Sequence, residues 1–342
     1  KQLLKYGIQA EFSKDITKIP SNLEDGKTHQ YRIFPYGKGK NWWQRGEARG
    51  ELGGPSSEIF YDLGQIEIKQ DTYHINDDSG RFVEIGNNVF MEYFLDDNLK
   101  WQSLVQKNID FGGGFERTAM CVQNKRDIFE TDLFESILKK IESISNKEYK
   151  TNSRNNEYTS CFRVIADHIR ASTFIIADGI IPSNKDQGYI LRKFLRRMVR
   201  FGKKLDIERN FGIELAKVVI QEMSPAYPYL IEQCEKIYST IEEEENKFRK
   251  TLSNGLKEID KLKNKNVQID GTVAFHIYET YGFPMELTLE EFNLDAKKTE
   301  ELITDFKSSA KIHQEKSRIG AMGKFKGGLA DQSVEVTKLH TT

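Results

Sequence analysis

The stretch Lys107-Asn108-Ile109-Asp110-Phe111-Gly112-Gly113-Gly114-Phe115-Glu116-Arg117 runs from a strand pattern through three glycines into a helix pattern. Glycines let a ligand approach the backbone closely, because they carry no side chain. The helix that follows offers unpaired N–H groups and a partial positive charge at its start, both suited to a phosphate. Arg117 adds a permanently charged fork for phosphate oxygens. The junction therefore predicts a phosphate-binding site at the end of a strand.

This junction matches neither of the two common nucleotide-binding fingerprints. The pattern G-x-G-x-x-G lacks its third glycine here, and the P-loop pattern lacks its G-K-[ST] ending. A second interpretation therefore stays open, in which the segment is a tight strand-to-helix connection and Arg117 pairs with a nearby Glu.

The junction also separates two kinds of sequence. Before it, β-branched and aromatic runs predict neighbouring strands of an antiparallel sheet at 31–34, 58–61 and 88–95. After it, the apolar spacing predicts helices at 132–145, 162–177, 188–205, 211–223 and 229–262. A thin apolar stripe beside the charge run 242–245 predicts that the last helix is exposed and packed along one side. The predicted fold class is α+β, a sheet domain followed by an all-α domain.

Composition predicts a soluble globular protein of two or three domains. The 342 residues are 38% hydrophobic, which suffices to bury cores. No apolar run reaches the roughly 18 residues of a membrane-spanning helix, so a cytoplasmic location is expected and no membrane partner. The three cysteines and six histidines lack the paired spacings of metal sites, so no protein metal site is predicted.

Basic residues cluster on one predicted helix, at 188–205. The net charge of the chain is −1, so a polyanion would have to be held by local clustering rather than by overall charge. The cationic side chains of this helix are Arg192, Lys193, Arg196, Arg197, Arg200, Lys203 and Lys204. They would suit a phosphate backbone. The alternative is a solvated face that pairs with the acidic helices downstream.

The segment from Asp110 to Arg117, Asp-x-Gly-x-Gly-x-Glu-Arg, resembles motif 3 of the class II aminoacyl-tRNA synthetases. In that family the arginine contacts the ATP phosphates and the glycines form the floor under adenine. The resemblance implies that Arg117, Gly112 and Gly114 bind ATP, with Mg²⁺ arriving on the nucleotide. The sheet would then be part of a class II synthetase antiparallel β-sheet domain.

Further stretches resemble the alanyl-tRNA synthetase family and follow that family's order: 41–44 with 54–62, then 84–91, 163–170 with 182–184, and 278–284. The resemblance implies ATP-dependent activation of alanine to alanyl-adenylate and its transfer to tRNA(Ala). It also implies three parts, namely the C-terminal part of the catalytic domain at 1–126, a helical tRNA-recognition domain at 127–318, and a linker at 319–342.

The same resemblance implies a role for individual residues. Arg117 and Asp110 would be catalytic, and Asp110 would receive the ammonium group of alanine. The residues implied to bind ATP are Gly112, Gly114, Arg117, Trp43 and Val89, and those implied to bind alanine are Trp43, Asn87, Asp110 and Gly112. From the residues alone, Trp43 fits a core tryptophan as well as a ligand contact, and Asp110 fits a turn-forming residue.

For tRNA, the resemblance implies that Asn184 reads the minor-groove side of the G·U pair in the acceptor stem, the accessible groove of RNA. Glu279 stands where the family has Asp. The implied tRNA contacts are Asn184, Glu279, Arg192, Arg196, Arg197 and Arg200. His168 lies within an apolar helical pattern, which favours a structural histidine over a catalytic one.

Several departures from the family pattern predict that the chain is a fragment. Nothing ahead of Trp42 resembles motifs 1 and 2, and the 49–55 segment lacks the family's cysteine. The family's editing domain and its Zn²⁺ site would follow His340-Thr341-Thr342. Any homo-oligomer contacts would come from such absent regions. A noncatalytic, tRNA-binding synthetase-like protein is the alternative function.

Overall fold

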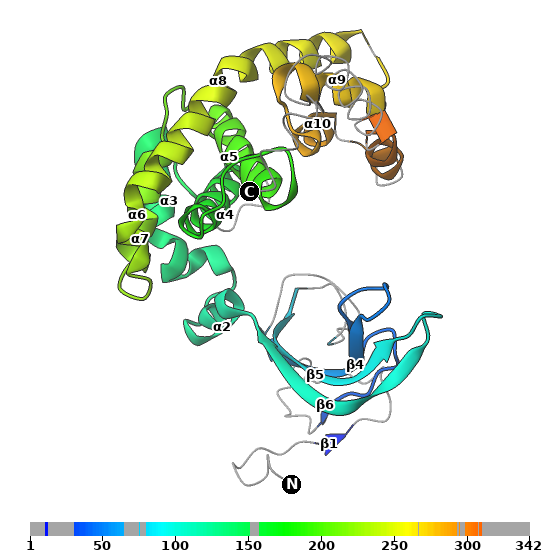
Figure 1. Cartoon of the computed structure of the whole chain (residues 1–342). Helices are drawn as coiled ribbons and strands as arrows, with labels where there is room; N and C mark the ends of the chain where they lie inside the picture. The colour runs from blue at the N-terminus through cyan, green and yellow to red at the C-terminus, as the bar shows by residue number, and fades with distance from the viewer. Residues whose placement is uncertain are drawn as a thin grey trace, which may run out of the picture. The chain divides into compact units, whose positions relative to one another are not determined.

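The structure, a computed structural model, describes residues 11–12, 31–64, 75, 80–150, 157–265, 267–292, 294, 298–306 and 308–309 (Figure 1). The chain divides into two compact units, Lys1–Glu135 and Ser136–Thr342. The predicted functional boundary at 126/127 remains a prediction, and the linker predicted at 319–342 lies outside the described residues.

The first unit is built on a four-stranded antiparallel sheet in the order β3-β4-β5-β6. Its strands are β3 (Trp42–Gln44), β4 (Leu52–Asp62), β5 (Phe82–Leu95) and β6 (Trp101–Gly113), and Figure 1 shows the last three side by side. The predicted strands at 58–61 and 88–95 are thus confirmed as neighbours. The strand predicted at 31–34 is wrongly assigned to this sheet, because β2 (Tyr31–Ile33) pairs in parallel with β1 (Glu11–Phe12).

Two contacts hold β4 against β5. A Cβ atom on Gly54 would lie 1.7 Å from the carbonyl oxygen of Phe90, so only glycine permits this approach of the two backbones. At the other end of the pair, the buried Arg81 guanidinium donates to the Asp62 carboxylate over 2.6 and 2.7 Å. Such a bidentate ion pair fixes the relative orientation of the two groups as well as their distance.

Helices begin where β6 ends. The elements that follow are α2 (Phe115–Val122), a 3-10 turn (Ile128–Glu130), α3 (Asp132–Ser145), α4 (Glu157–Ala177), α5 (Asp186–Lys204), α6 (Gly212–Met223), α7 (Tyr229–Glu232), α8 (Cys234–Asn264), α9 (Gly271–Tyr281) and α10 (Met285–Phe292). The α+β fold class is therefore confirmed. One long helix at 229–262 is a wrong prediction, because the chain breaks at Gln233 between α7 and α8.

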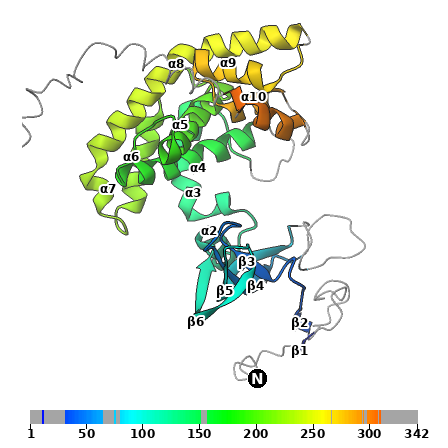
Figure 2. The ribbon, with the colours of Figure 1, turned by 45° about the vertical axis from the view of Figure 1, so that its right-hand side comes forward.

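The second unit packs around α8, which runs along α5 and α6 (Figures 1 and 2). Its apolar stripe is buried, as Ile237, Ile241 and Phe248 illustrate. The same side of α8 also buries Glu244 and Glu245, which are 3% and 1% exposed. The charge run 242–245 is therefore divided, with Glu242 and Glu243 exposed and these two carboxylates buried.

Among the described helices, none is both long enough and apolar enough to cross a membrane.

Candidate functional site

Strand pairing brings the residues predicted from the glycine-rich junction into two adjacent rows. Asn87 on β5 lies between Glu58 on β4 and Gly112 on β6. Two residues farther along β5, Val89 lies between Ser56 on β4 and Asp110 on β6. Paired residues share a face of a sheet, and side chains alternate between the faces. Asn87, Val89, Asp110 and Gly112 therefore share one face.

Asp110 and Gly112 leave room on this face. Asp110 is exposed, and its carboxylate makes no hydrogen bond or ion pair to any residue that the structure describes. A Cβ atom added to Gly112 would meet no atom within 4 Å. An accessible carboxylate beside an open backbone can accept a small cation such as an ammonium group.

Asn87 adds an unsatisfied acceptor next to Gly112. Its Nδ2 donates to Oε1 of Glu58 over 3.5 Å, while its Oδ1 is buried without a hydrogen-bond partner. A buried acceptor without a donor is unfavourable by about 1–3 kcal/mol, and a ligand N–H would relieve it. Burial raises the pKa of the Glu58 carboxyl, and the charge of Glu84 raises it further.

Arg117 stands on the first turn of α2, directly after the glycines. Its Nη1 donates to the carbonyl oxygen of Glu84 over 3.0 Å and lies 3.7 Å from the Glu84 carboxylate. The interpretation of Arg117 as the partner of a nearby Glu therefore describes a real contact. The Arg117 side chain nevertheless remains 53% exposed, so a phosphate can still reach it.

Trp43 lies farther across the same sheet, on β3 opposite Gly54. Its neighbour Trp42 packs against Tyr93 and Trp101, with ring centroids 5.6 and 5.1 Å away. Because successive side chains of a strand point to opposite faces, the two indole rings diverge. Both rings are half-buried, with Trp42 packed against these two aromatic residues and Trp43 on the other face.

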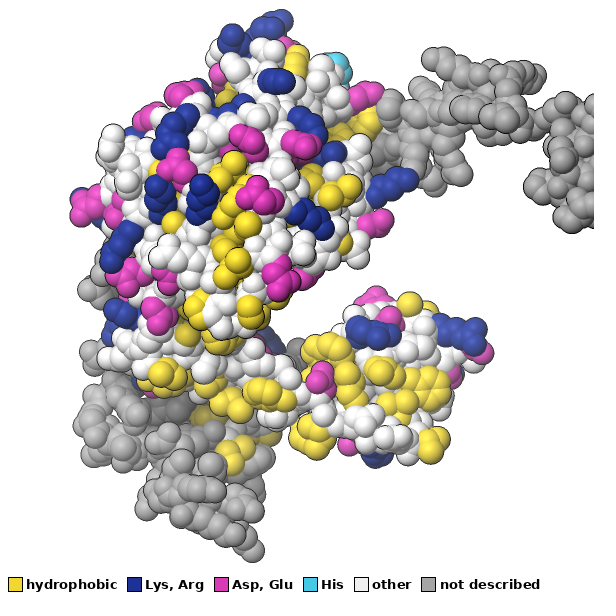
Figure 3. Space-filling view, turned by 60° about the vertical axis from the view of Figure 1, so that its left-hand side comes forward, with side chains coloured by type: hydrophobic (Ala, Val, Ile, Leu, Met, Phe, Trp, Pro, Cys, Tyr) yellow, Lys and Arg dark blue, Asp and Glu magenta, His cyan; other side chains and the backbone are white. Residues whose placement is uncertain are grey.

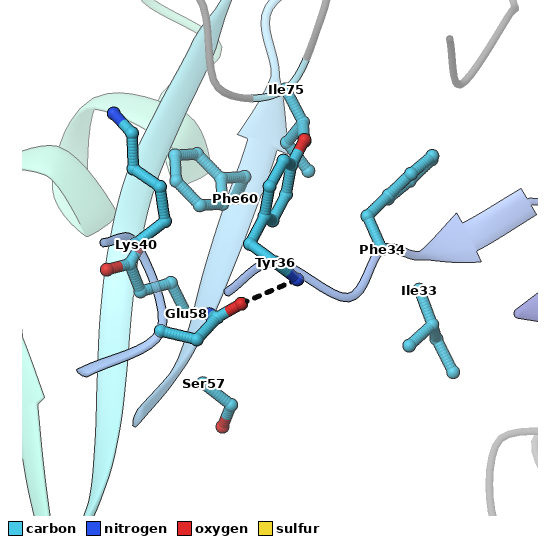
Figure 4. Close-up of a pocket in the computed structure, with 9 residues that line it drawn as sticks. Ile33, Phe34, Tyr36, Lys40, Ser57, Glu58, Phe60 and Ile75 are labelled. Atoms are coloured by element: carbon cyan, nitrogen blue, oxygen red, sulfur yellow. Dashed lines mark hydrogen bonds between the residues drawn. The ribbon is translucent and has the colours of Figure 1, made fainter. Parts of the chain in front are cut away.

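A pocket of about 200 Å³ opens beside Glu58. Figure 4 shows Tyr36, Phe60 and Ile75 together at one end and Ser57 at the other, with Lys40 and Glu58 between them. The backbone N–H of Tyr36 donates to Oδ1 of Asn41 over 2.9 Å, which fixes the loop that forms one wall. The pocket thus adjoins the face that carries Asn87.

Within the described ranges, no three His, Cys, Asp or Glu side chains gather closely enough to hold a metal ion on their own. Glu84 is near enough for its charge to raise the pKa of the Glu58 carboxyl. A divalent cation that is already bound to phosphates needs only one or two carboxylates from the protein, and this pair fits that requirement.

The basic residues of α5 face the carboxylates of α8 and α10. Arg196 contacts Glu244 at 2.7 Å, and Arg200 contacts Glu291 at 2.6 Å. Further pairs join Arg192 to Glu244, Lys193 to Glu286 and Arg197 to Glu290. Figure 3 likewise shows basic and acidic side chains interspersed on the visible face of the helical unit. The alternative of pairing with downstream acidic helices therefore describes these contacts, and RNA binding by the arginines stays a prediction.

Asn184 and the Glu279 segment come together although they are far apart in the sequence. The hydroxyl of Tyr278, the residue before Glu279, donates to Oδ1 of Asn184 over 3.3 Å. The Arg192 guanidinium donates to the same oxygen. Asn184 and Glu279 are both exposed, and the residue next to Glu279 is the one that contacts Asn184.

His168 is buried and fully engaged. Its Nδ1 lies 2.8 Å from the Asp167 carboxylate, its Nε2 lies 3.2 Å from the Arg197 guanidinium, and its ring packs on Phe194. This environment agrees with a structural histidine.

Glu58, Glu84 and Tyr278 lie beside the predicted residues and were not themselves predicted as site residues. Glu58 and Tyr278 fall within the stretches that carry the family resemblance, and Glu84 opens another. A charged or hydroxyl side chain at a fixed place in such a stretch was the available signal. What it contacts depends on strand register or on helix packing.

Comparison with known proteins gives a family and named relatives. The family model described as tRNA synthetases class II (A) matches residues 10–341. An alanine–tRNA ligase of Borreliella afzelii is 38% identical over 338 residues, which cover 95% of this chain and 55% of that protein. The alanine–tRNA ligase of Treponema pallidum is 38% identical over 310 residues, 88% of this chain and 50% of that protein.

A third relative, the alanine–tRNA ligase of Thermotoga maritima, is 40% identical over 294 residues, 85% of this chain and 33% of its own length. The chain thus spans about half, or less, of the curated relatives that it matches. Because the family model covers nearly the whole chain, the chain belongs to the class II tRNA synthetase family.

Proposed function

We propose that this chain is part of an alanine–tRNA ligase, which activates alanine with ATP and transfers it to tRNA(Ala). The observation that carries the proposal is the shared sheet face of Asp110, Asn87 and Gly112, with Arg117 at its edge. The names of the relatives support the amino acid and the tRNA.

Alanine binds as a zwitterion, and the face supplies groups for its cationic end. The exposed carboxylate of Asp110 receives the ammonium group. Oδ1 of Asn87 accepts a hydrogen bond from one N–H of the ammonium group, and this oxygen so gains the donor that it lacks in the free protein. Trp43 forms an aromatic wall that limits the side chain to a methyl group.

In the first step, a carboxylate oxygen of alanine bonds to the α-phosphorus of ATP while the bond to pyrophosphate breaks. In the second step, a ribose hydroxyl of the tRNA bonds to the carbonyl carbon, its proton is released, and AMP leaves. Arg117 stabilises negative charge on the phosphates, while Gly112 and Gly114 let the nucleotide lie against the backbone. Positioning of the two reactants accounts for much of such an acceleration.

Mg²⁺ would arrive with ATP and would be held by Glu84, with Glu58 close by. The ion supplies charge neutralisation on the phosphates. The two carboxylates fit it because the charge of Glu84 raises the pKa of the Glu58 carboxyl, a repulsion that a cation relieves.

The tRNA is proposed to meet the helical unit at the surface formed by Asn184 and Glu279. Arg192 borders this surface. Arg196, Arg197 and Arg200 contribute by holding α8 and α10 against α5, as well as by their charge.

The test is ATP–pyrophosphate exchange with each amino acid in turn, on this chain and on a form extended at its N-terminus. We expect exchange in at least one of the two forms, with alanine and with no other amino acid. In the active form, Arg117→Ala should lower the rate of exchange by roughly 100-fold or more, because one charged hydrogen-bond donor to the transition state is removed.

No exchange in either form, with tRNA still bound, would contradict the proposed ligase and favour a noncatalytic tRNA-binding protein. Exchange with a different amino acid would retain the synthetase and overturn its specificity for alanine.

A further inference from the structure

The side chain of Asn184 is held by two donors at a single atom. Nη1 of Arg192 and the hydroxyl of Tyr278 both donate to Oδ1. A guanidinium has no acceptor atom, so the end of the amide that faces Arg192 must be the oxygen. The opposite end, Nδ2 with its two N–H bonds, makes no hydrogen bond to any described residue.

The backbone that carries Asn184 is also fixed. Arg192 donates through Nη2 to the carbonyl oxygen of Pro182 over 3.3 Å, and the N–H of Ser183 donates to the carbonyl oxygen of Gly188 over 3.0 Å. A Cβ atom on Gly188 would lie 2.3 Å from Oγ of Ser183, so a glycine is needed where the loop crosses α5.

Arg192 is itself positioned from the far side. Its Nε lies 3.7 Å from the Glu244 carboxylate, and Glu244 is buried. An anchored arginine of this kind has little freedom to turn toward a phosphate. Its contacts assign it to the amide rather than to the nucleic-acid backbone.

We propose that Arg192 and Tyr278 are positioning residues that turn the Asn184 carbonyl inward and present its NH₂ group as a pair of hydrogen-bond donors to RNA. This inference rests on the proposed function, in which Asn184 meets the minor groove of tRNA. The RNA atoms that fit are acceptors, namely a pyrimidine O2, a purine N3 or a ribose 2′-oxygen.

The experiment measures binding of this chain to two RNA hairpins, one with a single G·U pair in its stem and one with G·C at that place. The chain is expected to prefer the G·U hairpin. Tyr278→Phe, which removes one donor to Oδ1, should lower that preference by about two- to tenfold, the usual range for one hydrogen bond. Affinity for the G·C hairpin should not change.

A matched control is Tyr281→Phe on the same helix, whose hydroxyl does not contact Asn184; it should leave the preference unchanged. Arg192→Lys keeps the charge but not the fork, so it should lower the preference while the salt dependence of binding stays the same. Asn184→Asp keeps the inward acceptor and loses the outward donors, so it should lose the preference.

A double-mutant cycle separates positioning from a general structural effect. In an Asn184→Ala background, Tyr278→Phe should have no further effect on the preference. An additive effect, or an Asn184→Asp variant that keeps the preference, would overturn the inference and leave the proposed function standing. Failure of the chain to bind either hairpin would overturn the proposed RNA contact and the inference with it.

Discussion

Replacing Glu245 by Ala is expected to destabilise the helical unit by about 3 to 5 kcal/mol, the usual loss when one partner of a buried ion pair is removed. For a unit of this size such a loss lowers the melting temperature by roughly 10 °C. Thermal unfolding followed by far-ultraviolet circular dichroism measures the change directly.

The reason lies in the partners that this carboxylate joins. Glu245 is 1% exposed and accepts from the backbone N–H groups of Phe211 and Gly212, where α6 begins. It also pairs with Arg249 at 2.9 Å, and Arg249 in turn donates to the carbonyl oxygen of Arg209 over 2.6 Å. One side chain of α8 thus caps α6 and fixes the loop before it.

Two variants test this explanation. Glu243→Ala removes a neighbouring carboxylate whose one ion pair among the described residues is with the exposed Lys247, so stability should change little. The stability of Glu245→Gln should lie between those of Glu243→Ala and Glu245→Ala, because the amide oxygen can still accept a hydrogen bond from a backbone N–H. Equal stability of Glu245→Ala and Glu243→Ala would contradict the role assigned to Glu245.

Burial raises the pKa of the Glu245 carboxyl, and Arg249 only partly opposes the shift. A raised folded-state pKa means that the folded state binds a proton more strongly than the unfolded state. The stronger proton binding stabilises the folded state. This stabilisation is fully present below the ordinary carboxyl pKa and is lost as the pH rises through the pKa of the folded state. Glu245→Gln should remove that part of the pH dependence.

Glu242-Glu243-Glu244-Glu245 marks one limit of prediction from sequence. Four identical residues carry no signal that distinguishes those that face water from those that face a neighbouring helix. The apolar stripe of α8 was predictable from its spacing, because burial of aliphatic side chains depends on helical period alone. Burial of Glu244 depends on Arg196 of α5, and burial of Glu245 on the N–H groups at the start of α6, partners that only packing supplies.

The candidate site divides in a similar way. The glycine-rich junction could be predicted because its strand, glycines and helix start are local features. That Asn87 lies opposite Gly112 depends on the strand register, which is irregular at places in both the β4–β5 and the β5–β6 pairings. The contact of Asn184 with Tyr278 joins residues 94 apart in the sequence, and the pairing of α5 with α10 spans a similar separation.

Gly112→Ala is expected to lower alanine-dependent ATP–pyrophosphate exchange by roughly 100-fold, the effect of displacing a reactant by about 1 Å. The measurement uses whichever form of the protein is active. Gly112 shares its face with Asp110 and Asn87, and a methyl group there would occupy the space proposed for the ligand.

The fold itself should not change in the Gly112→Ala variant. An added Cβ atom at Gly112 meets no protein atom within 4 Å, and its backbone lies outside the left-handed region that only glycine tolerates easily. Unchanged melting temperature with lost exchange would therefore separate ligand exclusion from misfolding.

Gly113→Ala is the matched control, because the next residue of the strand points to the opposite face. Its Cβ atom would lie 3.1 Å from the ring of Phe111, which is exposed and can move, and 3.8 Å from the carbonyl oxygen of Ile85, an ordinary contact distance. Exchange should stay within a few-fold of the parent protein, since no ligand is proposed on that side. If the two alanine variants lost activity equally, the loss would reflect strand geometry, and the assignment of the ligand to the face of Asp110 would fail. A loss confined to Gly112→Ala places the reacting groups on that face, because the two glycines differ chiefly in the direction of the added methyl group.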